Sequence, residues 1–187
     1  MAGQLQLDLF PASADETGTA PGSVDPSTCP RVLAELASRL PRGLRLGTSS
    51  WSFPGWEGLV YAHRYGEAQL ARDGLAAYAR HPLLRAVGLD RTFYAPLSAE
   101  DLSRYAASVP GGFRFLVKAS QGCTFPALLD SRGRWAPNPR FLDAAFARDA
   151  VVAPAVEGLG SRLGTLLFQF PPMPRHELRS PPGLLER

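Results

Sequence analysis

The chain has 187 residues, of which 45% are hydrophobic and 20% are charged, a composition typical of one globular domain with its own core. Its formal net charge of +3 is too small to favour nucleic-acid binding through bulk charge. No segment has the roughly 20 apolar residues that a membrane-spanning helix needs. Because the first basic residue is Arg31, no targeting peptide is indicated, and we expect a cytoplasmic protein whose Cys29 and Cys123 are reduced thiols.

Residues 1–29 are predicted to form a disordered arm, because residues 11–30 are rich in Pro, Ser, Thr, Gly and Asp and lack apolar periodicity. Near the start of this arm stands a short, largely apolar peptide: Gln6, Leu7, Asp8, Leu9 and Phe10. The peptide resembles the bacterial sliding-clamp-binding motif, in which a glutamine, two leucines and a phenylalanine dock in hydrophobic pockets of the replication clamp. The resemblance implies the clamp as a partner. The alternative, that the peptide folds back onto the domain, stays open.

The first elements after the arm are a helix and a short strand. Residues 30–40 place their apolar side chains on one helical stripe, which predicts a helix that closes the amino-terminal side of the domain. Residues 44–48 alternate like a strand and stop at a loop of small hydroxyls and two tryptophans. Residues 66–80 predict a helix, and the short apolar run 86–90 predicts the second strand.

The later elements continue the same alternation. Residues 98–108 begin with the form of a capping box and predict a helix, and residues 113–119 predict the third strand. Asn138 and the proline after it predict the start of another helix. Residues 164–170 are almost wholly apolar, as expected of a parallel strand buried on both faces. Strands separated by helices favour a parallel sheet.

Four motifs accompany the predicted strands: Gly47-Thr48-Ser49-Ser50-Trp51-Ser52 with Trp56 and Tyr61, Thr92-Phe93-Tyr94, residues 113–118 (FRFLVK) and residues 166–172 (LLFQFPP). In this order they resemble the YecE-like family, also called domain of unknown function 72, over residues 44–172. The resemblance implies an α/β fold of the TIM-type β/α barrel and no established reaction. Such barrels typically need about 250 residues. We therefore expect residues 30–187 to form about the first half of a barrel, with four parallel strands, and the chain to be truncated at its C-terminus.

Two departures from the family pattern limit what the resemblance implies. Many relatives have Glu-Ile-Asn before the Thr-Phe-Tyr step, whereas residues 88–94 of this chain read GLDRTFY, which resembles a subgroup of the family. Relatives also often carry Thr-His shortly after the lysine of the third strand, where residues 122–125 of this chain read GCTF. Roles that depend on that glutamate or histidine are therefore not carried over.

If the four strands are parallel neighbours, their carboxyl ends gather polar groups on one rim, where ligands bind in α/β folds. The predicted ligand-binding residues are Thr48, Ser49, Trp51, Arg91, Thr92, Tyr94 and Gln169. Lys118 and Asp90 are the predicted catalytic residues, and Lys118 is the only lysine of a chain rich in arginine. Lys118 offers a point charge or, when desolvated, a base or a nucleophile. Asp90 can accept a proton or orient a cation, and Arg91 can grip an oxyanion.

Each of these residues also has a purely structural interpretation. Asp90, Arg91 and Lys118 can pair with neighbouring charges, and Trp51 can belong to the core or to a lid. Gln169 can satisfy a backbone group. The three histidines share no ligand-like spacing with a carboxylate, so no metal site is predicted, and the sequence names no cofactor.

Three hypotheses for function follow. The first is an enzyme of the YecE-like family that binds a phosphorylated sugar or nucleotide-like ligand at the rim and is recruited to the sliding clamp. The second is a non-catalytic adaptor that binds nucleic acid. The third is a truncated, non-functional fragment, because half a barrel leaves two sheet edges and apolar faces exposed.

Overall fold

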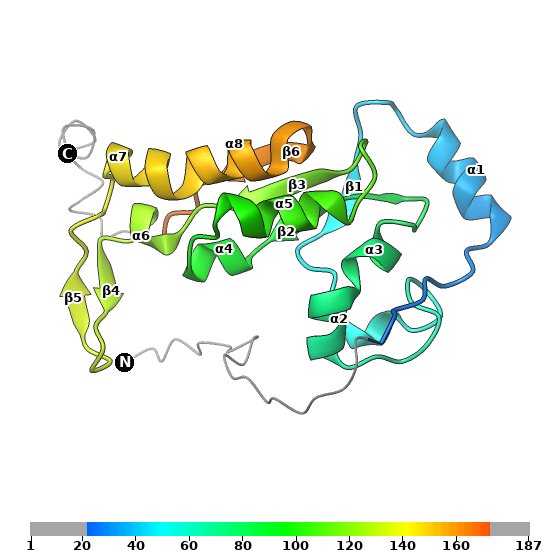
Figure 1. Cartoon of the computed structure of the whole chain (residues 1–187), viewed down its shortest axis with the longest axis horizontal. Coiled ribbons are helices and arrows are strands. Elements are labelled where there is room, and N and C mark those ends of the chain that lie inside the picture. The colour runs from blue at the N-terminus through cyan, green and yellow to red at the C-terminus, as the bar shows by residue number, and fades with distance from the viewer. Residues whose placement is uncertain (1–21, 173–187) are drawn as a thin grey trace.

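The computed structural model describes residues 22–172, so the clamp-like peptide at residues 6–10 lies outside the described residues. Four parallel strands form one sheet (Figure 1): β1 Leu46–Thr48, β2 Leu84–Leu89, β3 Arg114–Lys118 and β6 Leu163–Leu167. The strand order β1-β2-β3-β6 follows the chain, with helices between successive strands. The predicted parallel sheet is therefore confirmed.

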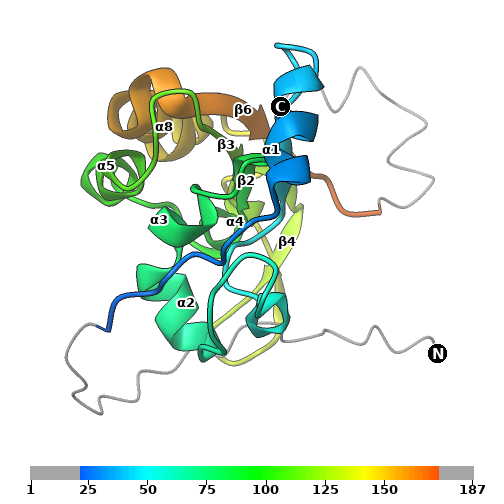
Figure 2. The same cartoon turned by 90° about the vertical axis from the view of Figure 1, so that its right-hand side faces the viewer.

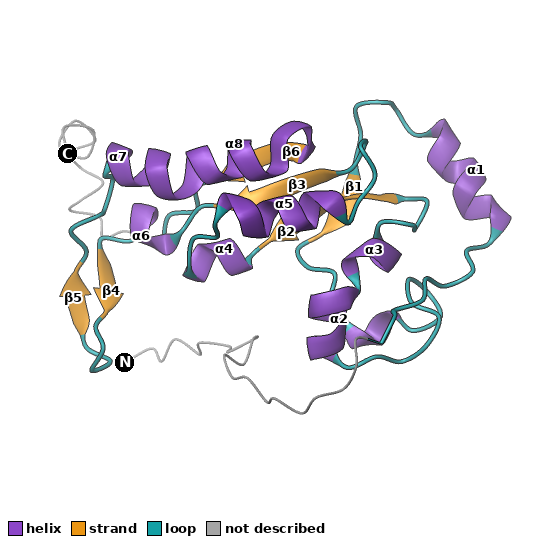
Figure 3. Ribbon diagram, viewed as in Figure 1, coloured by secondary structure: helices purple, strands orange, loops and turns teal. Residues whose placement is uncertain are grey.

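Helices fill the connections between these strands (Figure 3). The α-helices are α1 Arg31–Arg39, α2 Glu67–Asp73, α3 Leu75–Tyr78, α4 Arg91–Tyr94, α5 Ala99–Ala107, α6 Gln121–Thr124, α7 Ala144–Ala147 and α8 Ala153–Leu159. Short helical turns of other types lie at Pro54–Trp56, Arg148–Val152 and Gly160–Arg162. The helices predicted at residues 30–40 and 98–108 are confirmed as α1 and α5.

One face of the sheet is covered by α5 and α8, which lie side by side (Figure 2). Phe115 and Val117 of β3 are 0% and 2% exposed, and they pack in one core cluster with side chains of both helices. The two helices approach closely at Gly158, where a Cβ atom would lie 2.4 Å from the carbonyl oxygen of Ala99. This tight helix pair and the sheet beneath it form the main core.

The opposite face of the sheet is open in the part of the chain that the structure describes. By strand alternation it carries Leu116 of β3 and Leu167 of β6, which are 36% and 39% exposed. Thr165, which pairs with Leu116, is exposed as well. The prediction that this last strand is buried on both faces was therefore wrong, because no described element packs on its second side. Lys118 follows Leu116 by two residues and belongs to the same open face.

The position of α1 also differs from the expectation. We predicted that this helix closes the amino-terminal side of the domain, but α1 lies apart from the sheet (Figure 1). Val32 and Leu36 of its apolar stripe are 64% and 46% exposed, and only Ala37 is buried. The amphipathic pattern thus predicted the helix correctly but not a partner for its apolar face.

Two predicted helices have different bounds in the structure. The helix predicted at 66–80 is divided into α2 and α3 at Gly74, whose position leaves no room for a Cβ atom because the Leu70 carbonyl oxygen would lie 2.6 Å away. The helix predicted to start at Asn138 begins instead at Ala144, with the Asp143 carboxylate accepting hydrogen bonds from the first turn. Asn138 is used in a tertiary contact, since its amide Nδ2 donates to two backbone carbonyls of the 122–125 segment.

The end of the predicted arm is docked on the domain. The backbone N–H of Ser27 donates to the Val60 carbonyl at 2.8 Å, and the N–H of Ala62 donates to the Asp25 carbonyl at 2.9 Å. The backbone N–H of Asp25 also donates a hydrogen bond to the Tyr65 hydroxyl at 3.0 Å. Residues 25–27 therefore pack against the 57–65 loop, although the disordered arm was predicted to extend to residue 29.

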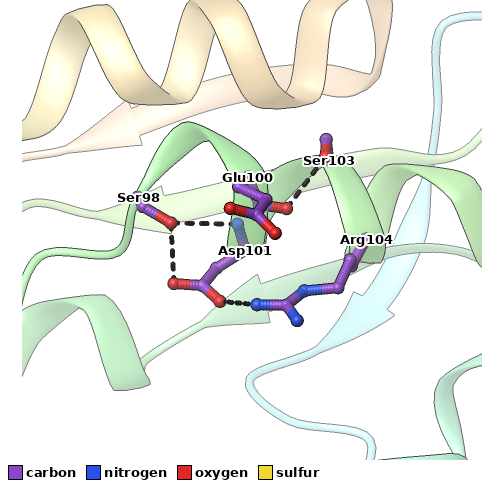
Figure 4. A network of polar contacts seen from close by, with 5 residues as sticks. All are labelled: Ser98, Glu100, Asp101, Ser103 and Arg104. Carbon is purple, nitrogen blue, oxygen red and sulfur yellow. Dashed lines mark hydrogen bonds and ion pairs between the residues drawn. The ribbon is translucent and has the colours of Figure 1, made fainter.

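A polar network fixes the start of α5 (Figure 4). Ser98 Oγ accepts a hydrogen bond from the backbone N–H of Asp101 at 3.1 Å and donates to the Asp101 carboxylate at 2.8 Å. Arg104 pairs with the same carboxylate one turn later. The hydrogen bonds from Ser98 and Arg104 lower the pKa of Asp101. The predicted cap at Ser98 is confirmed, but Asp101 bonds the Ser98 hydroxyl rather than its backbone N–H.

Candidate functional site

Asp90 and Lys118 lie next to each other at the carboxyl ends of two neighbouring strands. Asp90 follows β2, and Lys118 ends β3, which pairs with β2 in parallel. Lys118 Nζ is 3.3 Å from Asp90 Oδ1, and the two side chains are 20% and 29% exposed. Partial burial strengthens the attraction relative to a fully exposed pair, while both groups stay within reach of a ligand. The two residues that the sequence singled out for catalysis are thus brought together.

Thr92 and Phe93 surround this ion pair. Thr92 is 4% exposed, and its Oγ1 lies 2.6 Å from the Lys118 carbonyl oxygen and close to the Leu89 carbonyl oxygen. Its single proton serves one carbonyl at a time, so the hydroxyl links the ends of β2 and β3. The Phe93 ring centroid lies 5.3 Å from Lys118 Nζ, a cation–π contact. Thr92, expected at the ligand, therefore contacts the protein backbone and positions Lys118.

Thr48, at the end of β1, is held by a tyrosine that the sequence did not single out. Tyr78 is 0% exposed, and its hydroxyl accepts the Thr48 backbone N–H at 3.1 Å and donates to the Ala86 carbonyl at 3.0 Å. Thr48 Oγ1 lies 2.8 Å from the same hydroxyl and donates to the Ser50 carbonyl. Burial raises the pKa of Tyr78, and the hydrogen bonds with Thr48 partly oppose this rise. The neutral phenol therefore joins β1 to β2 below the rim.

Four other predicted residues are exposed: Ser49, Arg91, Tyr94 and Gln169. Ser49 approaches β2 at Gly88, where a Cβ atom would lie 2.9 Å from the Ser49 carbonyl oxygen. Tyr94 is 59% exposed and packs edge-on against the ring of Phe93, with 5.4 Å between ring centroids. Arg91 forms no ion pair within residues 22–172. Ser49, Arg91 and Gln169 follow the ends of β1, β2 and β6, and Lys118 pairs with Leu167, two residues before Gln169.

Trp51 lies in the core instead of facing the rim. Its side chain is 8% exposed, and its indole N–H donates to the Leu70 carbonyl at 3.0 Å. Its ring packs edge-on against Tyr105, with centroids 5.5 Å apart. The Tyr61 hydroxyl donates to the Trp51 carbonyl, and burial raises the pKa of Tyr61. This placement agrees with the structural interpretation of Trp51 and leaves little of its surface for a ligand.

A β-hairpin that the sequence did not predict follows β3. Its strands are β4 Ala127–Leu129 and β5 Trp135–Pro137, and it lies at the end toward which the β3 arrow points (Figure 1). Asp130 closes its turn by accepting the backbone N–H groups of Arg132 and Arg134. Trp135 is 69% exposed. The aspartate, followed three residues later by Gly133 with φ of 71°, was the local turn signal that could have revealed the hairpin.

The described part of the rim is an open surface rather than an enclosed pocket. Beside Thr92, Lys118 and Val151 lies a cavity with a volume of about 10 Å³, room for about one water molecule. Within residues 22–172 no group of three or more His, Cys, Asp and Glu side chains could hold a metal ion. Over the same residues, no helix has the length and apolar character to cross a membrane.

Comparisons with known structures place the fold. A crystal structure of a DUF72 family protein from Enterococcus faecalis V583 matches with a TM-score of 0.50 and 20% sequence identity, covering 76% of this chain and 44% of that chain. A second crystal structure of a DUF72 family protein from the same organism matches with a TM-score of 0.40 and 22% identity, covering 60% of this chain and 41% of that chain. This chain thus spans less than half the length of the solved structures it matches. No curated protein matches it.

The sequence profile of one family covers most of the chain. The family is described as "Protein of unknown function DUF72", and its profile matches residues 45–184. The match begins just before β1 and includes the four parallel strands with Asp90 and Lys118. It agrees with the family expected from the motifs at the strand ends. The chain therefore belongs to the DUF72 family.

Proposed function

We propose that this protein is an enzyme that binds a phosphorylated sugar or a nucleotide-like ligand at the carboxyl-terminal rim of its strands. The observation that carries the proposal is the half-buried pair of Asp90 and Lys118, with 3.3 Å between Oδ1 and Nζ. A cation held at a strand end by one carboxylate keeps donor capacity for an anionic ligand, because an ammonium group has three N–H donors. Ligands of α/β folds bind at this end of the sheet.

The side chains around the pair suit such a ligand. Lys118 supplies a point charge for a phosphate, and the exposed guanidinium of Arg91 can add two parallel hydrogen bonds. The exposed Tyr94 ring offers a surface for a sugar or a base, and Ser49 offers a hydroxyl. Asp90 orients Lys118 and is the group available to accept a proton from the ligand.

We further propose that the sheet is part of a β/α barrel. Strands in chain order with helices on one face are the arrangement of such barrels. The open face carries apolar side chains at Leu116 and Leu167, which would lie in the interior of a closed barrel. In a barrel, additional strands would pair with the outer edges of β1 and β6 and would bring further side chains to the rim.

Amine labelling tests the proposed ligand site directly. Lys118 is the only lysine, so an amine-reactive reagent modifies this side chain and the N-terminus alone. We expect ribose 5-phosphate or AMP to protect Lys118 from modification, as measured by peptide mass spectrometry. Lys118→Met should lower the affinity for the protecting ligand about tenfold or more, since a hydrogen bond to a charged group contributes roughly 1.5–3 kcal/mol. Arg64→Met removes an equal charge elsewhere and should leave the affinity unchanged.

Lack of protection by sugar phosphates and nucleotides alike would overturn this proposal. A salt-dependent affinity for DNA ends, without turnover and without protection of Lys118 by small ligands, would instead favour the non-catalytic nucleic-acid adaptor. A decrease in affinity that is equal for Lys118→Met and Arg64→Met would show that only the overall charge matters.

We also propose that the arm recruits the protein to the bacterial sliding clamp through residues 6–10, which lie outside the described residues. The support is the sequence pattern of Gln6, Leu9 and Phe10. Purified clamp should retain the native protein in a pull-down, and Leu9→Ala with Phe10→Ala should abolish retention, because a short peptide depends on a few deeply docked apolar side chains. Failure of the native protein to bind would contradict the idea, and Gln4→Ala is a control just outside the motif.

A further inference from the structure

A groove lies at the amino-terminal ends of β1, β2 and β3, at the opposite end of these strands from Asp90 and Lys118. Its volume is about 390 Å³, within the usual range of small-molecule sites. The loops before the three strands and the first residues of β2 form it, within residues 42–45, 79–85 and 110–113. We call it the basic groove, because four arginines line it: Arg42, Arg45, Arg80 and Arg85. Figure 2 views the molecule from the side of α1, which precedes the first of these loops.

The charges of the basic groove are not balanced by carboxylates. No Asp or Glu is among its lining residues. Elsewhere in the described part some exposed arginines pair with a nearby carboxylate, as Arg72 does with Asp73 and Arg134 does with Asp130, whereas others, such as Arg91, form no ion pair. The guanidinium groups of the four groove arginines form no hydrogen bond or ion pair within residues 22–172. Like charges that line one concave surface repel each other, so a bound anion would stabilise the groove.

The backbone of the groove is held by the same type of turn in each loop. The N–H of Leu44 donates to the Pro41 carbonyl at 2.9 Å. The N–H of Leu84 donates to the His81 carbonyl at 3.2 Å, and the N–H of Phe113 donates to the Pro110 carbonyl at 3.0 Å. Each bond closes a four-residue turn immediately before or at the start of a strand. The arginines therefore extend from a fixed framework, which reduces the entropy lost when a ligand binds.

The groove also has an apolar part. Leu44, Leu84 and Phe113 contribute to its lining beside the arginines. Phe113 is 3% exposed, so the apolar surface that a ligand can reach comes from Leu44 and Leu84. A compact anion that carries an apolar group matches both parts of the lining better than a long polyanion does.

We propose that the basic groove binds a nucleoside polyphosphate, with its phosphates on Arg42, Arg45, Arg80 and Arg85 and its base against the apolar part. Guanidinium groups bind phosphate oxygens through pairs of parallel hydrogen bonds, and several phosphates use several arginines at once. This site is separate from the proposed rim site, because the two lie at opposite ends of the strands. Its existence therefore does not depend on the proposed function.

Isothermal titration with ATP tests the proposal, carried out on Lys118→Met so that the rim lacks its ammonium group. We expect saturable binding of ATP to one site. The double variant Arg80→Glu with Arg85→Glu should weaken it about tenfold or more, since each replaced guanidinium removes charge-assisted hydrogen bonds. The control is Arg64→Glu with Arg132→Glu, which makes the same change of net charge at exposed residues outside the groove and should leave the affinity unchanged. Circular dichroism checks that each variant is folded. If the Arg80→Glu, Arg85→Glu protein is not folded, the double variant Arg80→Ala with Arg85→Ala is used in its place.

Three results would overturn the proposal. The first is the absence of ATP binding to the Lys118→Met protein. The second is equal weakening by the groove variant and by the control, which would indicate a general charge effect. The third is binding of a short DNA duplex in the groove with no binding of ATP, which would assign the arginines to a nucleic acid. If sugar phosphates and nucleotides fail to protect Lys118 from amine labelling while ATP still binds in the groove, the proposed function is rejected and the proposal for the groove stands.

Discussion

Phe115→Ala is expected to lower the free energy of unfolding by about 3–5 kcal/mol, the usual cost of removing a buried phenylalanine side chain and leaving a cavity. Phe115 is 0% exposed at the centre of β3, the strand that pairs with both β2 and β6. Its ring also packs edge-on against Phe113, with 5.4 Å between centroids. The sheet and its covering helices meet at this side chain, so the surroundings cannot close the cavity without moving both layers.

Urea unfolding followed by circular dichroism measures this loss. Leu116→Ala is the matched control, because Leu116 is the next residue of the same strand but faces the open side and is 36% exposed. We expect that control to lose about 1 kcal/mol, since much of its area is already in contact with water. If Phe115→Ala leaves no folded protein, Phe115→Leu should give a smaller loss that can be measured. Equal losses for Phe115→Ala and Leu116→Ala would contradict the description of one covered and one open face.

The pairing of Asp90 with Lys118 is the part of the site that followed from the sequence. Two apolar runs that each end in a charged residue predict parallel strands with their charges at one rim. The register explains why the charges meet: Leu89 lies opposite Val117, so the residues that follow them, Asp90 and Lys118, are neighbours. Strand order predicted only that both residues lie at one rim, and an ion pair with a neighbouring charge was one of the alternatives left open. The distance between the two groups needed the structure.

The contacts that position the rim could not be predicted from local patterns. Tyr78 had the appearance of an ordinary core residue on a helical stripe, and only the fold brings its hydroxyl between Thr48 and Ala86. Asn138 had the form of a helix start, yet its amide bonds the carbonyls of Gly122 and Phe125. In both cases the polar atom forms hydrogen bonds with a segment that is distant in the sequence. A sequence pattern of a few residues cannot predict such a partner.

The basic groove could not be predicted from the amino-acid composition either. Arginine is so frequent in this chain that no single arginine stands out, whereas the lone lysine does. The structure separates the arginines by their partners: Arg104 and Arg148 pair with carboxylates, whereas Arg42 and Arg85 line a groove that contains none. The net charge of +3 therefore underestimates how positive one end of the molecule is.

Gly47→Ala is expected to destabilise the protein by about 3 kcal/mol, the upper end of the usual cost of overpacking. A Cβ atom at Gly47 would lie 2.1 Å from the carbonyl oxygen of Ala86 and 2.6 Å from its carbonyl carbon. These are backbone atoms of the neighbouring strand, so no rotamer change can relieve the overlap, and β1 must move away from β2. That movement would stretch the link from Thr48 through the Tyr78 hydroxyl to Ala86, and it would displace Ser49 from the rim.

Gly43→Ala is the control for this change, because a Cβ atom at Gly43 would meet nothing within 4 Å. Its stability should stay within about 0.5 kcal/mol of the native protein. Thermal unfolding gives the stability of both variants, and near-ultraviolet circular dichroism reports on the packing of the tyrosine and tryptophan rings, Tyr78 among them. We expect a lower midpoint and an altered tyrosine signal for Gly47→Ala alone. A Gly47→Ala protein as stable as Gly43→Ala would show that β1 does not pair closely with β2, and Thr48 and Ser49 would lose their fixed position beside the end of β2.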